Sequence, residues 1–179
     1  MKSYEYVEEK IENMEEVKTW GTNKEINELP NVLGDNEELI YITSGLYDDN
    51  TWLIALTDKR ILFLDKGLIY GLKQKDITLD KVNSVEYETG IIFSRIKIWN
   101  GAEYIIIDKV LNKYAKIMVS HITEELELYK NRMLRPRIVE ETNEDRINQL
   151  AKLGKLRDAG VLTQEEFEET KRKILKDIV

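Results

Sequence analysis

The chain of 179 residues contains no cysteine, two prolines and a single histidine. Without cysteine it can form no disulfide, no thiolate nucleophile and no cysteine-ligated metal site. Its one histidine, His121, cannot build a histidine-rich metal site and has no nucleophile motif beside it in the sequence. Gly-rich phosphate loops and dinucleotide-binding fingerprints are absent as well. We therefore expect a protein that is not an enzyme and that carries no cofactor or metal.

Long apolar runs are also missing, because no stretch approaches the ~20 residues of a membrane-spanning helix. The N-terminal segment is acidic and amphipathic, unlike a signal peptide, so we expect a cytoplasmic protein without membrane insertion. The formal net charge is −7, and its excess lies in residues 1–38, which hold eleven acidic and four basic side chains. Nucleic-acid-binding proteins usually carry a basic field, so this charge disfavours nucleic acid as the main partner.

The hydrophobic period changes along the chain. Residues 4–20 carry apolar side chains at helical spacing, which predicts an N-terminal amphipathic helix that docks on its own domain or on a partner. Asp58-Lys59 and Asn100-Gly101 are two-residue hairpin connections, the second favouring a type I′ turn, and Gly45 and Asn50 flank a longer loop. Apolar side chains at helical spacing recur over 109–134, which predicts a long helix there. Runs with period two, rich in β-branched and aromatic residues, predict seven strands: 38–44, 51–57, 60–65, 70–79, 82–89, 91–99 and 103–108.

Seven short antiparallel strands must curl to cover their edges, and the helix that follows them can close one end. This layout resembles the pleckstrin-homology (PH) fold. The resemblance is most specific at Ala55–Phe63 (ALTDKRILF), with Glu37-Glu38-Leu39 and Glu28-Leu29-Pro30 before it. These motifs resemble bacterial PH-like domains of the YokE type over about residues 23–131. The resemblance implies an α+β fold, a seven-stranded curled sheet or barrel capped by a helix.

The last residues, from Ile147 to Val179, predict two short amphipathic helices. Gly160 fits the left-handed position that ends the first helix, and Thr163 with Glu166 predicts a capping box that begins the second. The run resembles the SHOCT domain, a short C-terminal module, over about residues 143–178. Such a module is added to a larger domain, which implies an assembly or adaptor protein.

The composition and the prolines predict four segments. They are an N-terminal amphipathic helix within 1–22, a PH-like domain over 23–134, a linker over 135–142 and a helical hairpin over 143–179. Pro136 disfavours helix at the residue before it, which sets the boundary between the PH-like domain and the linker.

The hairpin is expected to bury its apolar stripe against another protein or another copy, because fewer than ~40 residues seldom form a sufficient core. We therefore expect a protein-interaction or assembly protein that forms a homo-oligomer and binds a protein partner. The resemblance also allows a phage- or prophage-encoded protein that binds a host protein. The residues expected to make the contact are Leu150, Leu153, Leu156, Leu162, Phe167 and Ile174.

A second hypothesis is a nucleic-acid or nucleotide binder. Residues 93–99 alternate, so basic and aromatic side chains share one face on which a base could stack. The competing interpretation is a solvent-facing sheet surface with ordinary cross-strand packing. Phosphoinositide binding is not carried over from other PH domains, because Asp48 and Asp49 in the first loop would repel phosphate. The residues of this basic and aromatic set are Lys73, Lys75, Arg95, Lys97 and Trp99.

Overall fold

The computed structural model describes residues 2–67, 71–134 and 143–176. The chain divides into two compact units, Met1–Leu134 and Arg135–Val179. The predicted linker, residues 135–142, lies outside the described residues. Each unit has its own helices and its own buried side chains.

Seven antiparallel strands in the order β4-β3-β2-β1-β7-β6-β5 build the first unit. The expected α+β fold, a curled antiparallel sheet followed by a helix, is confirmed. Helix α4 (Asn112–Leu134) begins three residues later than the spacing predicted, because the last strand continues to Leu111. The strands are β1 (Leu39–Tyr47), β2 (Asn50–Thr57), β3 (Arg60–Gly67), β4 (Gly71–Thr78), β5 (Val82–Thr89), β6 (Phe93–Asn100) and β7 (Glu103–Leu111), and a 3₁₀ turn η1 (Leu79–Lys81) precedes β5.

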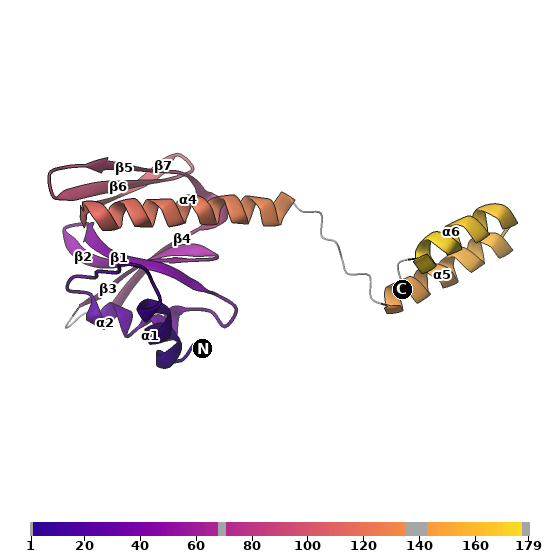
Figure 1. The fold of residues 1–179 in the computed structure, drawn as a ribbon, viewed down its shortest axis with the longest axis horizontal. Coiled ribbons are helices and arrows are strands. Elements are labelled where there is room, and N and C mark those ends of the chain that lie inside the picture. The colour runs from indigo at the N-terminus through magenta and orange to yellow at the C-terminus, as the bar shows by residue number, and fades with distance from the viewer. Residues whose placement is uncertain (1, 68–70, 135–142, 177–179) are drawn as a thin grey trace. The chain divides into compact units, whose positions relative to one another are not determined.

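The sheet bends where its two halves join. Strand β1 pairs with β2 along most of its length but with β7 only at Leu46 opposite Asp108. In Figure 1, α4 runs between the half formed by β1–β4 and the half formed by β5–β7. Both halves and α4 contribute to one apolar core, which includes Tyr41, Ile54, Leu56, Phe63, Ile96, Ile98, Ile107, Ala115, Met118 and Ile122.

The other face of the β1–β4 half is covered by three short helices, α1 (Tyr4–Glu12), α2 (Asn23–Ile26) and α3 (Leu29–Val32). Figure 1 shows α1 and α2 on this side. Val7 of α1 packs with Leu29, Leu39 and Leu53, so the N-terminal helix packs on its own domain.

Helix α1 is shorter than the predicted helix over 4–20. It ends at Glu12, and Glu16 has a left-handed φ of 53° that no helix accommodates. Met14, one of the apolar residues that suggested a longer helix, packs against both apolar cores from non-helical backbone, as does Val17. Tertiary packing therefore overrides the helical spacing over residues 13–20.

Two hairpin turns also differ from their predicted types. The predicted longer loop between Gly45 and Asn50 is a two-residue turn, because β1 continues to Tyr47 and β2 begins at Asn50. Asp48 and Asp49 both have positive φ, 50° and 59°, as a type I′ turn requires. In the β6–β7 turn only Gly101 has positive φ, which fits type II′ and not the predicted type I′.

The second unit is a pair of helices, α5 (Asn143–Asp158) and α6 (Gln164–Lys176), that pack on each other. Gly160 has φ +69°, and the Val161 N–H donates to the Leu156 carbonyl at 3.0 Å, so the predicted left-handed helix end is confirmed. The Thr163 N–H donates to Glu166 Oε2 at 2.9 Å and the Glu166 N–H donates to Thr163 Oγ1 at 3.3 Å. The predicted capping box is therefore present.

Candidate functional site

The motif that carries the PH resemblance forms a buried ionic contact. Glu37, which is 3% exposed, accepts hydrogen bonds from Arg60 Nε at 2.8 Å and from Arg60 Nη2 at 2.9 Å. It also accepts bonds from Thr57 Oγ1 and from the Gly34 N–H, both at 2.9 Å. Arg60 Nη2 donates to the Val32 carbonyl at 2.9 Å. These bonds tie the segment before β1 to the β2–β3 hairpin, so the motif has a structural role.

The two ionic groups stabilise each other's charged forms. Burial raises the pKa of Glu37, but the hydrogen bonds from Arg60, Gly34 and Thr57 together outweigh burial, and the pKa lies below its ordinary value. The hydrogen bond to Glu37 raises the pKa of Arg60. Both side chains are therefore charged at neutral pH, and neither is free to bind a ligand.

Basic and aromatic side chains lie together on β6 and β7. Lys97 Nζ lies 4.0 Å from the Trp99 ring centroid and 4.3 Å from the Tyr104 ring centroid. The Trp99 indole N–H donates to Glu86 Oε1 at 3.0 Å, and Glu86 lies directly opposite Lys97 on β5. An acidic side chain thus accompanies the cation on this face.

The other members of the basic set also have partners. Arg95 Nε donates to Asp108 Oδ1 at 2.6 Å. Lys73 forms an ion pair with Asp65 at 3.5 Å. Lys75 Nζ donates to the Tyr47 hydroxyl at 2.9 Å. Strand β4, which carries the two lysines, belongs to the other half of the sheet, so the five residues do not form one face.

The residues predicted to make contacts from the hairpin differ in exposure. Leu153 and Phe167 are buried between the helices of the hairpin, and Arg157 lies over the Phe167 ring at 4.6 Å from its centroid. Leu150, Leu162 and Ile174 are half-buried. Leu156 is 44% exposed. Further exposed apolar side chains on the hairpin are Ile147, Val161 and Leu175.

Residues 13–22, between α1 and α2, form an N-terminal arm. A hollow of about 410 Å³ lies where this arm meets β1, β7 and the first turn of α4. The sequence interpretation did not identify it. Its lining includes Lys18 and Trp20 from the arm, Leu46 from β1, Lys109 from β7 and Tyr114 from α4. These residues come from distant parts of the chain, and none carries a local motif.

An exposed apolar tip, Ile91 and Ile92, lies next in the chain to Phe93, which lines this hollow. Ile91 is 99% exposed and Ile92 is 59% exposed. Asn112 holds the tip: its Nδ2 donates to the Gly90 carbonyl at 2.9 Å and its backbone N–H donates to the Ile92 carbonyl at 3.0 Å. Residue 91 was predicted to begin a strand, but β6 begins at Phe93.

Comparison with known proteins gives matches to two domain families. Residues 33–124, just over half of the chain, match the bacterial PH domain family. The chain belongs to this family. Residues 148–175 match the short C-terminal domain, SHOCT, so the resemblances noted in the sequence are both confirmed. An uncharacterised protein of Archaeoglobus fulgidus is 28% identical over 185 residues, which cover 84% of this chain and 97% of that protein.

The solved structures similar to this chain have lower sequence identity to it. A DUF1696 family protein with a pleckstrin-homology domain from Shewanella loihica is 22% identical, covers 62% of this chain and 99% of its own, and has a TM-score of 0.43. A pleckstrin homology domain from Shewanella amazonensis is 24% identical over 48% of this chain and 80% of its own, with a TM-score of 0.35. The hSac2 domain from human phosphoinositide phosphatase Sac2 is 14% identical over 63% of this chain and 81% of its own, with a TM-score of 0.42.

The first hairpin tip of this bacterial PH domain is acidic. Asp48 and Asp49 line a hollow of about 590 Å³ together with Asp108, Arg95 and Lys109. Because Asp108 already neutralises Arg95, this hollow offers no surplus of positive charge to a phosphate group.

Bacterial PH and SHOCT domains are non-catalytic modules. The single histidine, His121, lies on α4 with its ring centroid 5.0 Å from that of Tyr41, and its Nδ1 is 3.7 Å from Glu124 Oε2. Across the described residues, no helix is both long and apolar enough to cross a bilayer.

Proposed function

We propose that this protein is a non-enzymatic assembly protein, in which the SHOCT hairpin drives self-association and the PH domain presents a surface to a protein partner. The observation that carries the proposal is the poor burial of the hairpin's apolar side chains. Among its described residues only Leu153 and Phe167 are buried, whereas Leu156 and Leu175 are 44% and 40% exposed.

Self-association follows from the size of the hairpin. A pair of helices this short buries too little apolar surface to offset the conformational entropy that folding removes. Covering Ile147, Leu156 and Leu175 with a second hairpin would add apolar burial at about 25 cal/mol per Å². Charge does not oppose this contact, because residues 141–179 hold eight basic and nine acidic side chains.

Sedimentation of the full-length chain tests the proposal. We expect an oligomer, and Leu156→Glu with Leu175→Glu should shift it to the monomer while leaving the Leu153–Phe167 contact within the hairpin in place. Asn148→Glu with Gln164→Glu, which adds the same two charges at one exposed position on each helix, serves as the control and should leave the oligomer intact. A full-length chain that sediments as a monomer at all concentrations would refute self-association.

The partner of the PH domain, including a host protein of a phage or prophage, stays a prediction. Affinity capture from nuclease-treated lysate with the wild-type chain and the Leu156→Glu/Leu175→Glu variant separates two outcomes. A protein captured by both chains is bound outside the exposed stripe of the hairpin. A protein captured by the wild type alone requires that stripe or the oligomer.

Nucleotide or nucleic-acid binding is the second candidate, and the observation in its favour is the cluster of Lys97, Trp99 and Tyr104. Against it, Glu86 lies opposite Lys97, and Arg95 is paired with Asp108. Phosphate binding would weaken steeply with salt. We expect no salt-dependent binding of a single-stranded oligonucleotide, and binding that Lys97→Glu abolishes would favour this second candidate.

A further inference from the structure

The hollow beside the N-terminal arm has walls that are held in place. The Trp20 backbone N–H donates to Ser44 Oγ at 2.8 Å, and the Tyr41 hydroxyl donates to the Glu16 carbonyl at 3.0 Å. The Glu16 carboxylate pairs with Lys113 of α4 at 2.6 Å. These contacts fix the arm on β1 at one side and on α4 at the other. A ligand that enters a preformed hollow loses less free energy to the ordering of the protein.

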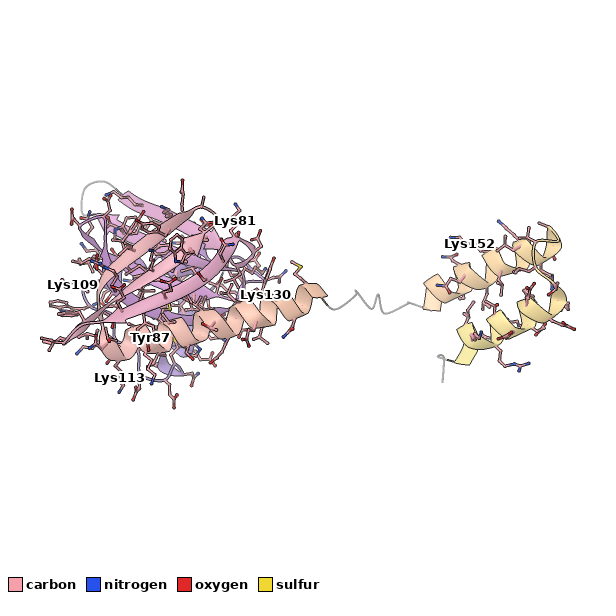
Figure 2. All side chains as sticks on the ribbon, turned by 90° about the horizontal axis from the view of Figure 1, so that it is seen from above. Lys81, Tyr87, Lys109, Lys113, Lys130 and Lys152 are labelled. Carbon is pink, nitrogen blue, oxygen red and sulfur yellow. The ribbon has the colours of Figure 1, made fainter. Side chains whose placement is uncertain are left out.

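The shape of the sheet creates the hollow. Strand β1 pairs with β7 at one position only, and the chain leaves that pairing through Lys109, which has a left-handed φ of 58°. Around this short pairing, Leu46 of β1 and Thr51 of β2 line the hollow together with Lys109 and Leu111 of β7. Lys109 and Lys113 lie at the same end of the barrel in Figure 2, away from Lys130 near the other end of α4.

The lining of the hollow is apolar with positive charge. Trp20, Leu46, Phe93 and Leu111 supply apolar surface, and Thr43, Ser44 and Thr51 supply small polar groups. Lys18 and Lys109 are its charged residues, and none of the described residues that line it is acidic. Lys109 Nζ lies 5.8 Å from the Phe93 ring centroid, so the cation is next to the apolar wall. The chain as a whole has a net charge of −7, so the positive charge of this lining is a local feature of the surface.

The backbone at Lys109 gives a second, independent observation. A left-handed φ costs a side-chain-bearing residue roughly 1–2 kcal/mol, which glycine avoids. Residue 109 is nevertheless a lysine. No ion pair among the described residues accounts for its side chain. Lys109 also lines two neighbouring hollows, of about 590 Å³ and about 260 Å³. The left-handed φ belongs to a β-bulge, because the register of β6 and β7 shifts between Ser94 and Ile96, and bulges beside concave sites re-aim a side chain.

We propose that this hollow binds an amphiphilic anion, a molecule with an acyl or aromatic body and a single carboxylate or sulfonate. The body would lie between Trp20, Phe93 and Leu111, and the anion would accept hydrogen bonds from Lys109 and Lys18. The volume, about 410 Å³, falls within the ~300–1,000 Å³ of small-molecule pockets. A nucleotide fits less well, because two lysines in an apolar lining offer no set of donors for several phosphates. The inference does not depend on the proposed self-association of the hairpin.

Titration calorimetry of the full-length chain with sodium decanoate tests the inference, with decyltrimethylammonium as the matched cation. We expect one decanoate per chain, bound below the concentration at which it forms micelles, and at least about tenfold weaker binding of the cation. Equal binding of the two amphiphiles would overturn the proposal, because apolar contact alone would then explain it.

Two variants locate the site. Lys109→Gly removes the cation and relieves the left-handed backbone, so it should leave the melting temperature unchanged or raised while it weakens decanoate binding about tenfold. Lys18→Gln should also weaken binding, and Lys97→Gln, on the outer face of β6, should not. Decanoate affinity that is unchanged in both Lys109→Gly and Lys18→Gln would refute the assignment.

Vesicles distinguish a free amphiphile from a membrane surface. The exposed Ile91–Ile92 tip directly precedes Phe93, which lines the hollow. A bilayer that contacts the tip is therefore the alternative source of acyl chains. We expect no co-sedimentation with phosphatidylcholine vesicles, with or without phosphatidylglycerol. Vesicle binding without binding of free decanoate would overturn the proposal in favour of a membrane contact through the tip.

Discussion

Replacing Glu37 by Gln should destabilise the barrel much more than the same change at its neighbour Glu38. Glu37 accepts four hydrogen bonds, two from Arg60 and one each from Thr57 and Gly34. A glutamine side chain keeps one acceptor oxygen but turns an N–H₂ group toward donors. The substitution thus removes the nearer counter-charge of the Arg60 guanidinium, which keeps only Asp76 at 3.7 Å, and leaves at least one buried donor without an acceptor.

The expected cost can be worked out from the burial of the pair. Removing one partner of a fully buried ion pair costs about 3–5 kcal/mol. The Arg60 side chain is 20% exposed, so water can replace part of the lost contact, and we expect about 2–3 kcal/mol. For a unit of this size that corresponds to a fall in melting temperature of roughly 6–12 °C. Glu38, whose side chain is 58% exposed and pairs with Lys10, should lose less than about 1 kcal/mol when replaced by Gln.

Urea unfolding of the full-length chain, followed by tryptophan fluorescence and circular dichroism, measures both changes. A cycle with Glu37→Gln, Arg60→Gln and the double variant should give a coupling free energy above about 1 kcal/mol. The pH dependence has a definite sign. The folded pKa of Glu37 lies below its unfolded pKa, so its stabilisation is complete above the unfolded value and is lost as pH falls through the folded value. A Glu37→Gln variant as stable as Glu38→Gln would refute the reasoning. The reasoning would also fail if both variants lost unfolding free energy with falling pH as steeply as the wild type.

Three further predictions concern stability. Gly45→Ala would place a Cβ 2.5 Å from Ile107 Cγ2, so we expect the overpacked β1–β7 junction to lose about 1–3 kcal/mol in a urea titration. Burial and nearby acidic groups raise the pKa of Glu125 although Arg132 opposes them. Its ionisation therefore costs stability as pH rises above the unfolded value, and Glu125→Gln should raise the melting temperature at pH 7 but not at pH 4. Thr163→Ala removes the N-cap of α6 and should cost the hairpin about 1 kcal/mol, measured as lost helicity on heating; an unchanged transition would show that the cap is dispensable.

Sequence patterns that act over a few neighbouring residues predicted the secondary structure well. Residues 82–89 were predicted as a strand with the observed bounds, because alternation and β-branched residues act over neighbouring positions. The Gly160 helix end and the Thr163–Glu166 capping box were likewise confirmed, since their bonds span only three to five residues. The motif around Glu37 and Arg60 indicated the fold, although only the structure shows that the two residues bind each other.

Signals that depend on distant partners were misread. The apolar residue Met14 suggested a longer helix, but it packs from non-helical backbone against cores that contain residues of distant strands. The basic and aromatic residues of β4 and β6 were grouped by type, whereas the strand order places them in different halves of the sheet. Asp65, Glu86 and Asp108, which accompany them, could not be assigned from spacing alone.

The sequence alone determined the number of strands and their positions along the chain, the capping helix, the two modules and the acidic tip of the first hairpin. These features follow from short-range alternation, turn chemistry and net charge, which are local properties of the chain. The tertiary structure alone decided the hollow beside the N-terminal arm, the exposed isoleucine tip held by Asn112, and the partners of each charged side chain. They arise where β1 leaves β7 and where residues far apart in sequence meet, and no local pattern encodes such a meeting.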